Sequence, residues 1–176
     1  DIWIEARPGD TAMQNRYVGD IGDYVKLAVL RALSENYRLG IAWWLYPDEA
    51  HNRDGRHVTY LEDPAQWRDF DSELFDILLK IVRDNRRCVR SLEVALPPGA
   101  VFAHEEIPVK NVAARMRPQQ RGQWLSRVQR DLRGADLVFV DPDNGLEPAG
   151  FKPCQKHSGK SILFSELREL AQPGRC

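Results

Sequence analysis

A short run of carboxylate and amide side chains follows the most apolar strand that the sequence predicts. Residues 137–140 are Leu, Val, Phe and Val, a pattern typical of a buried strand, and Asp141 comes directly after them. Asp143, Asn144 and Glu147 follow in a stretch rich in Pro, Asp, Asn and Gly, which must turn. Ligands of open α/β sheets bind at the carboxyl ends of strands, so we expect these side chains to lie in a site.

Two kinds of chemistry suit these residues. Carboxylate oxygens are the ligands that Mg²⁺ prefers, and Asp141, Asp143 and Glu147 offer three carboxylates within one turn, which predicts a metal site. Alternatively, Asp141 and Asn144 accept hydrogen bonds from a substrate amine. A third interpretation gives the turn a structural role only, with Asn144 or Gly145 at positive φ.

A second group of polar residues precedes a helical pattern near residues 22–36. Asp20, Asp23 and Lys26 lie around two Gly-Asp pairs, and either aspartate can cap the helix. We expect Asp20 or Asp23 to lie on the same rim of the sheet as Asp141, where mutual repulsion raises the pKa values of the carboxyl groups. The alternative is a capped, buried helix without chemistry.

Residues 110–133 form the one strongly basic segment, with seven Lys and Arg residues against the single acid Asp131. A basic helix face can follow phosphates, or it can be a solvated face paired with the acids of residues 62–76. The net charge of -1 gives no general attraction to nucleic acid, so binding depends on a local patch. The predicted nucleic-acid contacts are Lys110, Arg115, Arg117 and Arg121.

Apolar runs alternate with helical patterns along the whole chain. This alternation predicts one three-layer, Rossmann-like α/β domain over residues 1–176, with a mainly parallel sheet. The predicted strands cover residues 39–45, 100–104 and 137–141, with a short strand at 57–61 and an extended segment at 91–96. The predicted helices lie near residues 22–36, 71–85, 121–133 and 160–170.

Composition narrows the class of protein. Hydrophobic residues make up 43% and charged residues 29% of the chain, as in globular proteins, and no run approaches the roughly 20 apolar residues of a membrane span. No basic-then-apolar leader pattern is visible, which predicts a cytoplasmic protein. Cys88, Cys154 and Cys176 are scattered without metal-ligand spacing and are interpreted as reduced thiols.

The Pro-Gly pair at residues 173–174 favours a turn into a further strand, yet the sequence stops at residue 176. We therefore expect C-terminal strands of the sheet to be lacking and a homodimer to cover the exposed edge. The expected contact is made by Ile162, Leu163, Phe164 and Leu167, joined by Trp43 or Trp44 where either reaches the surface.

Two motifs carry a family resemblance. VGDxGDxxK at residues 18–26 and DPDNGLEP at residues 141–148 resemble those of a family of uncharacterised bacterial proteins, which implies a Rossmann-like fold without an assigned activity. The turn at residues 141–144 is also similar to the Asp-Pro-Pro-Tyr turn of S-adenosylmethionine-dependent amino-methyltransferases, where it holds the amine to be methylated. No Gly-x-Gly loop follows an early strand here.

The sequence therefore predicts a metal-dependent phosphodiesterase or nuclease, with Mg²⁺ at the Asp141 turn and arginines on the phosphate backbone. The alternatives are a methyltransferase-like protein that uses S-adenosylmethionine and a non-catalytic binding domain. The predicted catalytic residues are Asp20, Asp23, Lys26, Asp141, Asp143 and Asn144.

Overall fold

A computed structural model of the protein describes residues 15, 17–46 and 57–171. Its helices are α1 (Ile21–Leu33), α2 (Pro64–Trp67), α3 (Ser72–Arg83), α4 (Arg117–Asp131) and α5 (Phe164–Leu170). Its strands are β1 (Leu39–Ala42), β2 (Val101–Ala103) and β3 (Leu137–Val140). None of the helices described there has both the length and the apolar character needed to cross a membrane.

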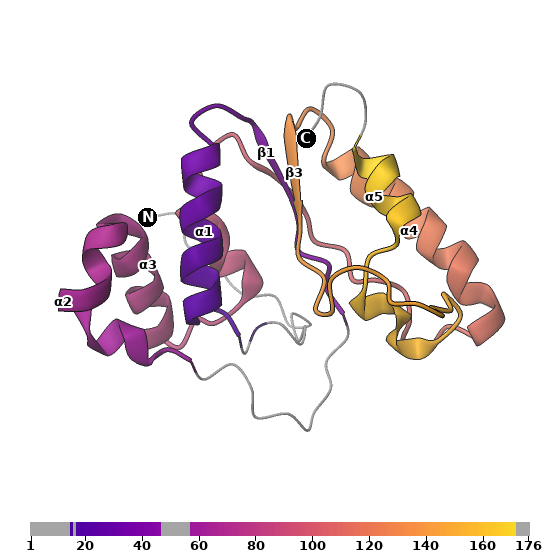
Figure 1. The fold of residues 1–176 in the computed structure, drawn as a ribbon, viewed down its shortest axis with the longest axis horizontal. Coiled ribbons are helices and arrows are strands. Elements are labelled where there is room, and N and C mark those ends of the chain that lie inside the picture. Colours follow the sequence, from indigo (N-terminus) through magenta and orange to yellow (C-terminus); the bar gives the residue numbers. More distant parts are fainter. Residues whose placement is uncertain (1–14, 16, 47–56, 172–176) are drawn as a thin grey trace.

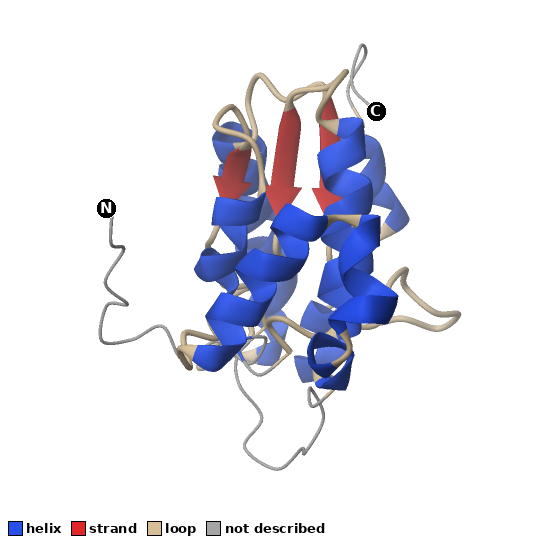
Figure 2. Ribbon diagram, turned by 90° about the vertical axis from the view of Figure 1, so that its left-hand side faces the viewer, coloured by secondary structure: helices blue, strands red, loops and turns tan. Residues whose placement is uncertain are grey.

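The three strands form one parallel sheet in the order β2-β1-β3. Gly40 at the centre pairs with Val101 on one side and Val138 on the other, and the three strands run in the same direction (Figure 2). The carboxyl ends of all three strands therefore lie at one edge of the sheet. The prediction of an α/β fold with a mainly parallel sheet is confirmed, although three strands do not establish a Rossmann-like strand order.

Helices cover both faces of the sheet. Helices α1 and α3 lie on one face, and α4 and α5 lie on the other (Figure 1). Because strand side chains alternate between faces, Ile41 and Trp43 pack in the core under α1 and α3, while Ala42 and Trp44 pack in the core under α4. The carboxyl end of β1 is thus buried from both sides.

Two segments predicted as extended are 3₁₀ helices, so these predictions are wrong. The predicted strand at 57–61 gives way to a 3₁₀ helix at Thr59–Glu62, and the predicted segment at 91–96 lies in the 3₁₀ helix Val89–Ala95 except for Leu96, its C-cap. In the second of these helices, apolar residues recur at every third position. A 3₁₀ helix has three residues per turn, so Val89, Leu92 and Ala95 lie on one buried side of it.

The surface predicted for dimer contact is largely buried. Trp43, Trp44 and Ile162 lie in the interior, while Leu163 and Leu167 are half-buried. Phe164 is 59% exposed, so it remains available for the predicted homodimer, which stays a prediction.

Arg121 lies inside the protein rather than on a phosphate-binding face. Its side chain is 4% exposed, and its guanidinium donates to both carboxylate oxygens of Glu166 and to the carbonyl oxygens of Ser158 and Ser161, over 2.5–2.8 Å. The prediction that Arg121 contacts nucleic acid is therefore wrong. The sequence shows that Arg121 is charged, but it does not show that its partner is Glu166, which lies 45 residues further along the chain.

We expect the substitution Arg121→Ala to lower the free energy of unfolding by about 3–5 kcal/mol, because it leaves the buried Glu166 carboxylate without its partner. Arg127→Ala is the matched control on the same helix, since Arg127 pairs with Glu105 at the surface, where a pair contributes at most about 1 kcal/mol. Urea denaturation measures both. Similar small losses in the two variants would contradict a structural role for Arg121.

Candidate functional site

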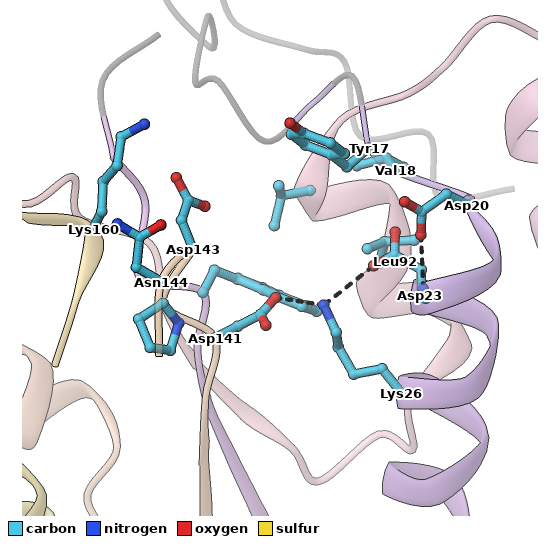
Figure 3. Close-up of a pocket in the computed structure, with 14 residues that line it drawn as sticks. Tyr17, Val18, Asp20, Asp23, Lys26, Leu92, Asp141, Asp143, Asn144 and Lys160 are labelled. Carbon is cyan, nitrogen blue, oxygen red and sulfur yellow. Dashed lines mark hydrogen bonds and ion pairs between the residues drawn. The ribbon is translucent and has the colours of Figure 1, made fainter. Parts of the chain in front are cut away.

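A pocket of about 450 Å³ opens beside the start of α1, at the carboxyl ends of β1 and β3 (Figure 3). This volume lies within the range of small-molecule sites. The residues that line it are Tyr17, Val18, Asp20, Gly22, Asp23, Lys26, Trp43, Val89, Leu92, Asp141, Pro142, Asp143, Asn144 and Lys160. All six residues predicted to be catalytic are among them. Asp20 and Asp23 line the same pocket as Asp141, so the prediction that the two motifs meet in one acidic cleft is confirmed.

The start of α1 places its two aspartates differently. Asp20 is the N-cap, and its carboxylate accepts from the backbone N–H of Asp23 at 3.0 Å. Asp23 points back into the preceding turn and accepts from the N–H of Gly19 at 2.9 Å, with its side chain almost fully buried. Gly19 has φ +84°, a conformation that favours glycine, and a Cβ there would meet Val82 at 2.7 Å.

Lys26 joins the two predicted motifs. Its ammonium nitrogen lies 2.6 Å from Oδ2 of Asp141 and 3.4 Å from Oδ1 of Asp23, as the dashed lines in Figure 3 show. Lys26 follows Asp23 by three residues, so both side chains leave the same face of α1. The ion pair fixes the start of the helix against the end of β3.

The electrostatics of this group favour a charged lysine and a titrating aspartate. Burial raises the pKa of Asp23 to about 6, against the lowering effects of Lys26 and the Gly19 N–H, and Asp20 and Asp141 raise it further. Burial is thus a larger cause than the repulsion expected from the sequence. Burial alone would lower the pKa of Lys26, but Asp141 and Asp23 together raise it. A carboxyl group with a pKa of about 6 is ionised to a large extent at neutral pH and can still be protonated there, which is what a general acid or base requires.

The turn after β3 is anchored by a segment close to α5. The N–H of Asn144 donates to the carbonyl of Lys160 at 2.8 Å, and a parallel bridge joins Leu146 to Ile162. Gly145 has φ +68°, as one interpretation of the sequence expected of Asn144 or Gly145. This anchoring presents Asp141, Asp143 and Asn144 to the pocket.

The predicted magnesium ligands do not come together. Glu147 does not line the pocket; its Oε1 accepts instead from the N–H of Phe164 at 3.0 Å, at the start of α5. Among residues 15, 17–46 and 57–171, no group of three or more His, Cys, Asp or Glu side chains could hold a metal ion. The prediction of a site at Asp141, Asp143 and Glu147 is wrong, because the turn at Gly145 leads Glu147 to α5.

The remaining residues predicted to contact nucleic acid do not lie together at the pocket. Lys110 and Arg115 are exposed, while Arg117 donates to the carbonyl oxygens of Val112 and Cys154. None of them lines the pocket. A phosphate-binding role for Lys110, Arg115 and Arg117 stays a prediction.

Trp43 and Lys160 are two of the lining residues that the sequence analysis did not place in a site. Trp43 directly follows β1, so the rule that sites form at strand ends could have identified it; its indole N–H donates to Glu93 at 3.2 Å. Lys160 gave no sequence signal, because its segment reaches the pocket through contacts with the turn after β3: the Asn144 N–H bond to its carbonyl and the bridge between residues 146 and 162. Its ammonium lies 5.1 Å from the ring centroid of Tyr46.

Comparison of the chain with protein-family models, with curated proteins and with solved structures found no match. The pocket is therefore the basis on which a function can be inferred.

We expect Asp23→Asn to stabilise the protein at alkaline pH. The pKa of Asp23 is raised in the folded state, so the wild-type protein loses stability as pH rises from about 4 through 6, by about 3 kcal/mol for a shift of this size. An asparagine keeps an acceptor for Gly19 N–H without the buried charge. The variant should therefore melt above the wild type at pH 8, and the difference should shrink towards pH 4.

Thermal melts across this pH range measure the effect. Asp63→Asn is a suitable control, since Asp63 caps α2 at an exposed position. A gain that is the same at pH 4 and pH 8 would show that burial of the Asp23 charge is not its cause.

Proposed function

We propose that this protein is a methyltransferase-like enzyme that holds a substrate amine at the turn of residues 141–144. The observation that carries the proposal is the position of that turn. It follows β3, which pairs with the central strand β1, and it lines the pocket at their carboxyl ends. In the amino-methyltransferases that this turn resembles, the corresponding turn holds the amine to be methylated.

The side chains of the turn suit an amine. Lys26 uses one of about four acceptor positions of the Asp141 carboxylate. The remaining positions and the amide oxygen of Asn144 can accept amine hydrogens. Asp23, which is ionised above about pH 6, is suited to receive the proton that the amine loses.

S-adenosylmethionine fits the chemistry of the pocket. Four aspartates and two lysines line it, which gives a formal charge of -2 when all are ionised, and the sulfonium of this cofactor is positively charged. Gly22, at the start of α1, lines the pocket without a side chain, and a Cβ there would meet Oδ1 of Asp20 at 3.1 Å. Asp20 and Asp143 would hold the cationic part, and the bound cofactor would supply the methyl group. A glycine-rich loop after β1 plays no part, since Trp43, Trp44 and Tyr46 follow that strand and are buried.

A metal-dependent phosphodiesterase has less support. Its expected carboxylate ligands are not assembled, and the carboxylate of Asp141 is paired with Lys26. Mg²⁺ with a dinucleotide is therefore a comparison ligand in the test below.

We expect S-adenosylhomocysteine and S-adenosylmethionine to raise the melting temperature. A ligand at 100 times its Kd stabilises the native state by about 2.7 kcal/mol, which corresponds to roughly 5–10 °C for a chain of this size. Asp143→Asn should weaken S-adenosylmethionine more than S-adenosylhomocysteine, because only the former carries the sulfonium charge. Asp69→Asn, an exposed position outside the pocket, is the control.

Transfer of a radiolabelled methyl group to amine substrates tests the reaction itself, and Asn144→Ala should reduce it. Stabilisation by Mg²⁺ with a dinucleotide, without any response to the two adenosyl compounds, would overturn the proposal in favour of the phosphodiesterase.

A further inference from the structure

A second groove opens beside the C-terminal half of α1, apart from the pocket of the candidate site. Its volume is about 680 Å³, and its lining shares no residue with that pocket. The lining comes from three parts of the chain: α1 with the turn after it, the segment that leads into α3, and the segment that leads into β2. Helices α1 and α3 cover the same face of the sheet (Figure 1). A role for this groove is therefore independent of the proposed function.

The groove is rich in apolar side chains that remain exposed. Phe70 and Val94 line it and are 76% and 62% exposed. Along α1 the apolar surface continues through residues spaced by three and four positions, which share one side of a helix: Val25, Ala28, Val29 and Ala32. Four of the eight large hydrophobic side chains that are exposed in the described part of the chain lie in this groove or on this stripe. Such a concentration of exposed apolar surface marks an interaction site.

The charges of the groove leave a negative excess. Three carboxylates and one guanidinium line it, which gives a formal charge of -2. Nε of Arg31 donates to Asp71 at 2.8 Å, and Nη2 donates to Glu73 at 2.5 Å. Its Nη1 donates to the carbonyl of Ala95 at 2.8 Å, so each nitrogen of the guanidinium is engaged. The side chain of Glu73 is nevertheless 72% exposed, and Glu35 is exposed as well, so a ligand in the groove meets negative charge.

We propose that this groove docks a cationic amphipathic helix of a partner protein. The apolar face of that helix lies on Phe70 and Val94, and its lysines or arginines lie beside Glu35 and Glu73. A helix matches the shape, because the apolar stripe of α1 runs from residue 25 to residue 32, roughly 10 Å, and small alanine side chains let a second helix approach closely. Recognition of a helix in a groove depends on such apolar contacts, and complementary charge sets the choice of partner.

The same charges argue against a second copy of this chain as the occupant. A two-fold contact places a surface patch against itself. Glu35 and Glu73 of two subunits would then lie across the interface from one another, and the like charges would repel. The anionic surface of a membrane is disfavoured for the same reason.

The test is fluorescence anisotropy of the full chain with a labelled peptide that carries leucines at positions i, i+3, i+4 and i+7 and lysines elsewhere. A peptide with glutamates in place of the lysines is the comparison. The lysine peptide should bind, and the double variant Phe70→Ser with Val94→Ser should weaken it about tenfold or more, because two apolar side chains leave the interface. Glu35→Lys should weaken it about threefold, with a smaller effect at high salt.

Two variants outside the groove are the matched controls. Met116→Ser with Phe164→Ser removes two exposed apolar side chains, and Glu106→Lys reverses an exposed charge. Both should bind the lysine peptide like the wild type. Melting temperatures of all variants verify that each of them folds.

Three results would each overturn the proposal: no binding of the lysine peptide by the wild type, equal binding by the groove variants and the wild type, or binding of the glutamate peptide as tight as that of the lysine peptide. Light scattering tests the other occupant. A dimer that dissociates in the variant Phe70→Ser with Val94→Ser, without binding of the lysine peptide, would assign the groove to a second copy of the chain instead.

Discussion

The ion pair between Lys26 and Asp141 connects the two parts of the chain that form the pocket. Its atoms are 2.6 Å apart, although the residues are separated by 115 positions in the sequence. The pair is partly buried, so each charge loses hydration, and their attraction offsets that cost only while α1 and the end of β3 keep their positions. The second carboxylate, Asp23, places a further negative charge beside Lys26. The geometry of the pocket thus depends on one ammonium held between two aspartates.

The other side of the pocket depends on a different ion pair. Arg121 binds Glu166 and the carbonyl oxygens of Ser158 and Ser161, and these residues flank the Lys160 carbonyl that anchors Asn144. The same guanidinium lies 5.8 Å from the ring centroid of Trp44, which has φ +52° and packs edge-on against Trp124. Such backbone strain costs about 1–3 kcal/mol and persists only where packing imposes it. Arg121 is therefore a structural residue whose interactions extend to the end of β1 and to the turn after β3.

Periodicity and the strand-end rule accounted for the sheet, the main helices and the meeting of Asp20, Asp23 and Lys26 with Asp141. These features follow from local patterns and from the geometry of a parallel sheet. Sequence patterns did not predict three other features: the burial of Arg121, the contact of Glu147 with α5 and the position of Lys160. Each depends on a partner far away in the sequence, and a residue's type does not reveal whether its charge is paired inside or solvated outside. The 3₁₀ helices were missed because spacing by three over seven residues also fits an irregular extended segment.

A purely structural turn would explain only part of the pocket. Gly145 at positive φ and the Asn144 N–H bond to Lys160 account for the backbone of that turn. They do not account for Asp23, whose buried carboxylate has a raised pKa and disfavours the folded state above pH 6. The Gly19 N–H, which donates to this carboxylate, would also be satisfied by an asparagine, which carries no charge. An ionisable side chain in this position is an advantage where a proton is exchanged, and natural sites accept reduced stability for such groups. In the proposed function this carboxylate would receive the proton that the substrate amine loses, and in the structure it also pairs with Lys26 at 3.4 Å.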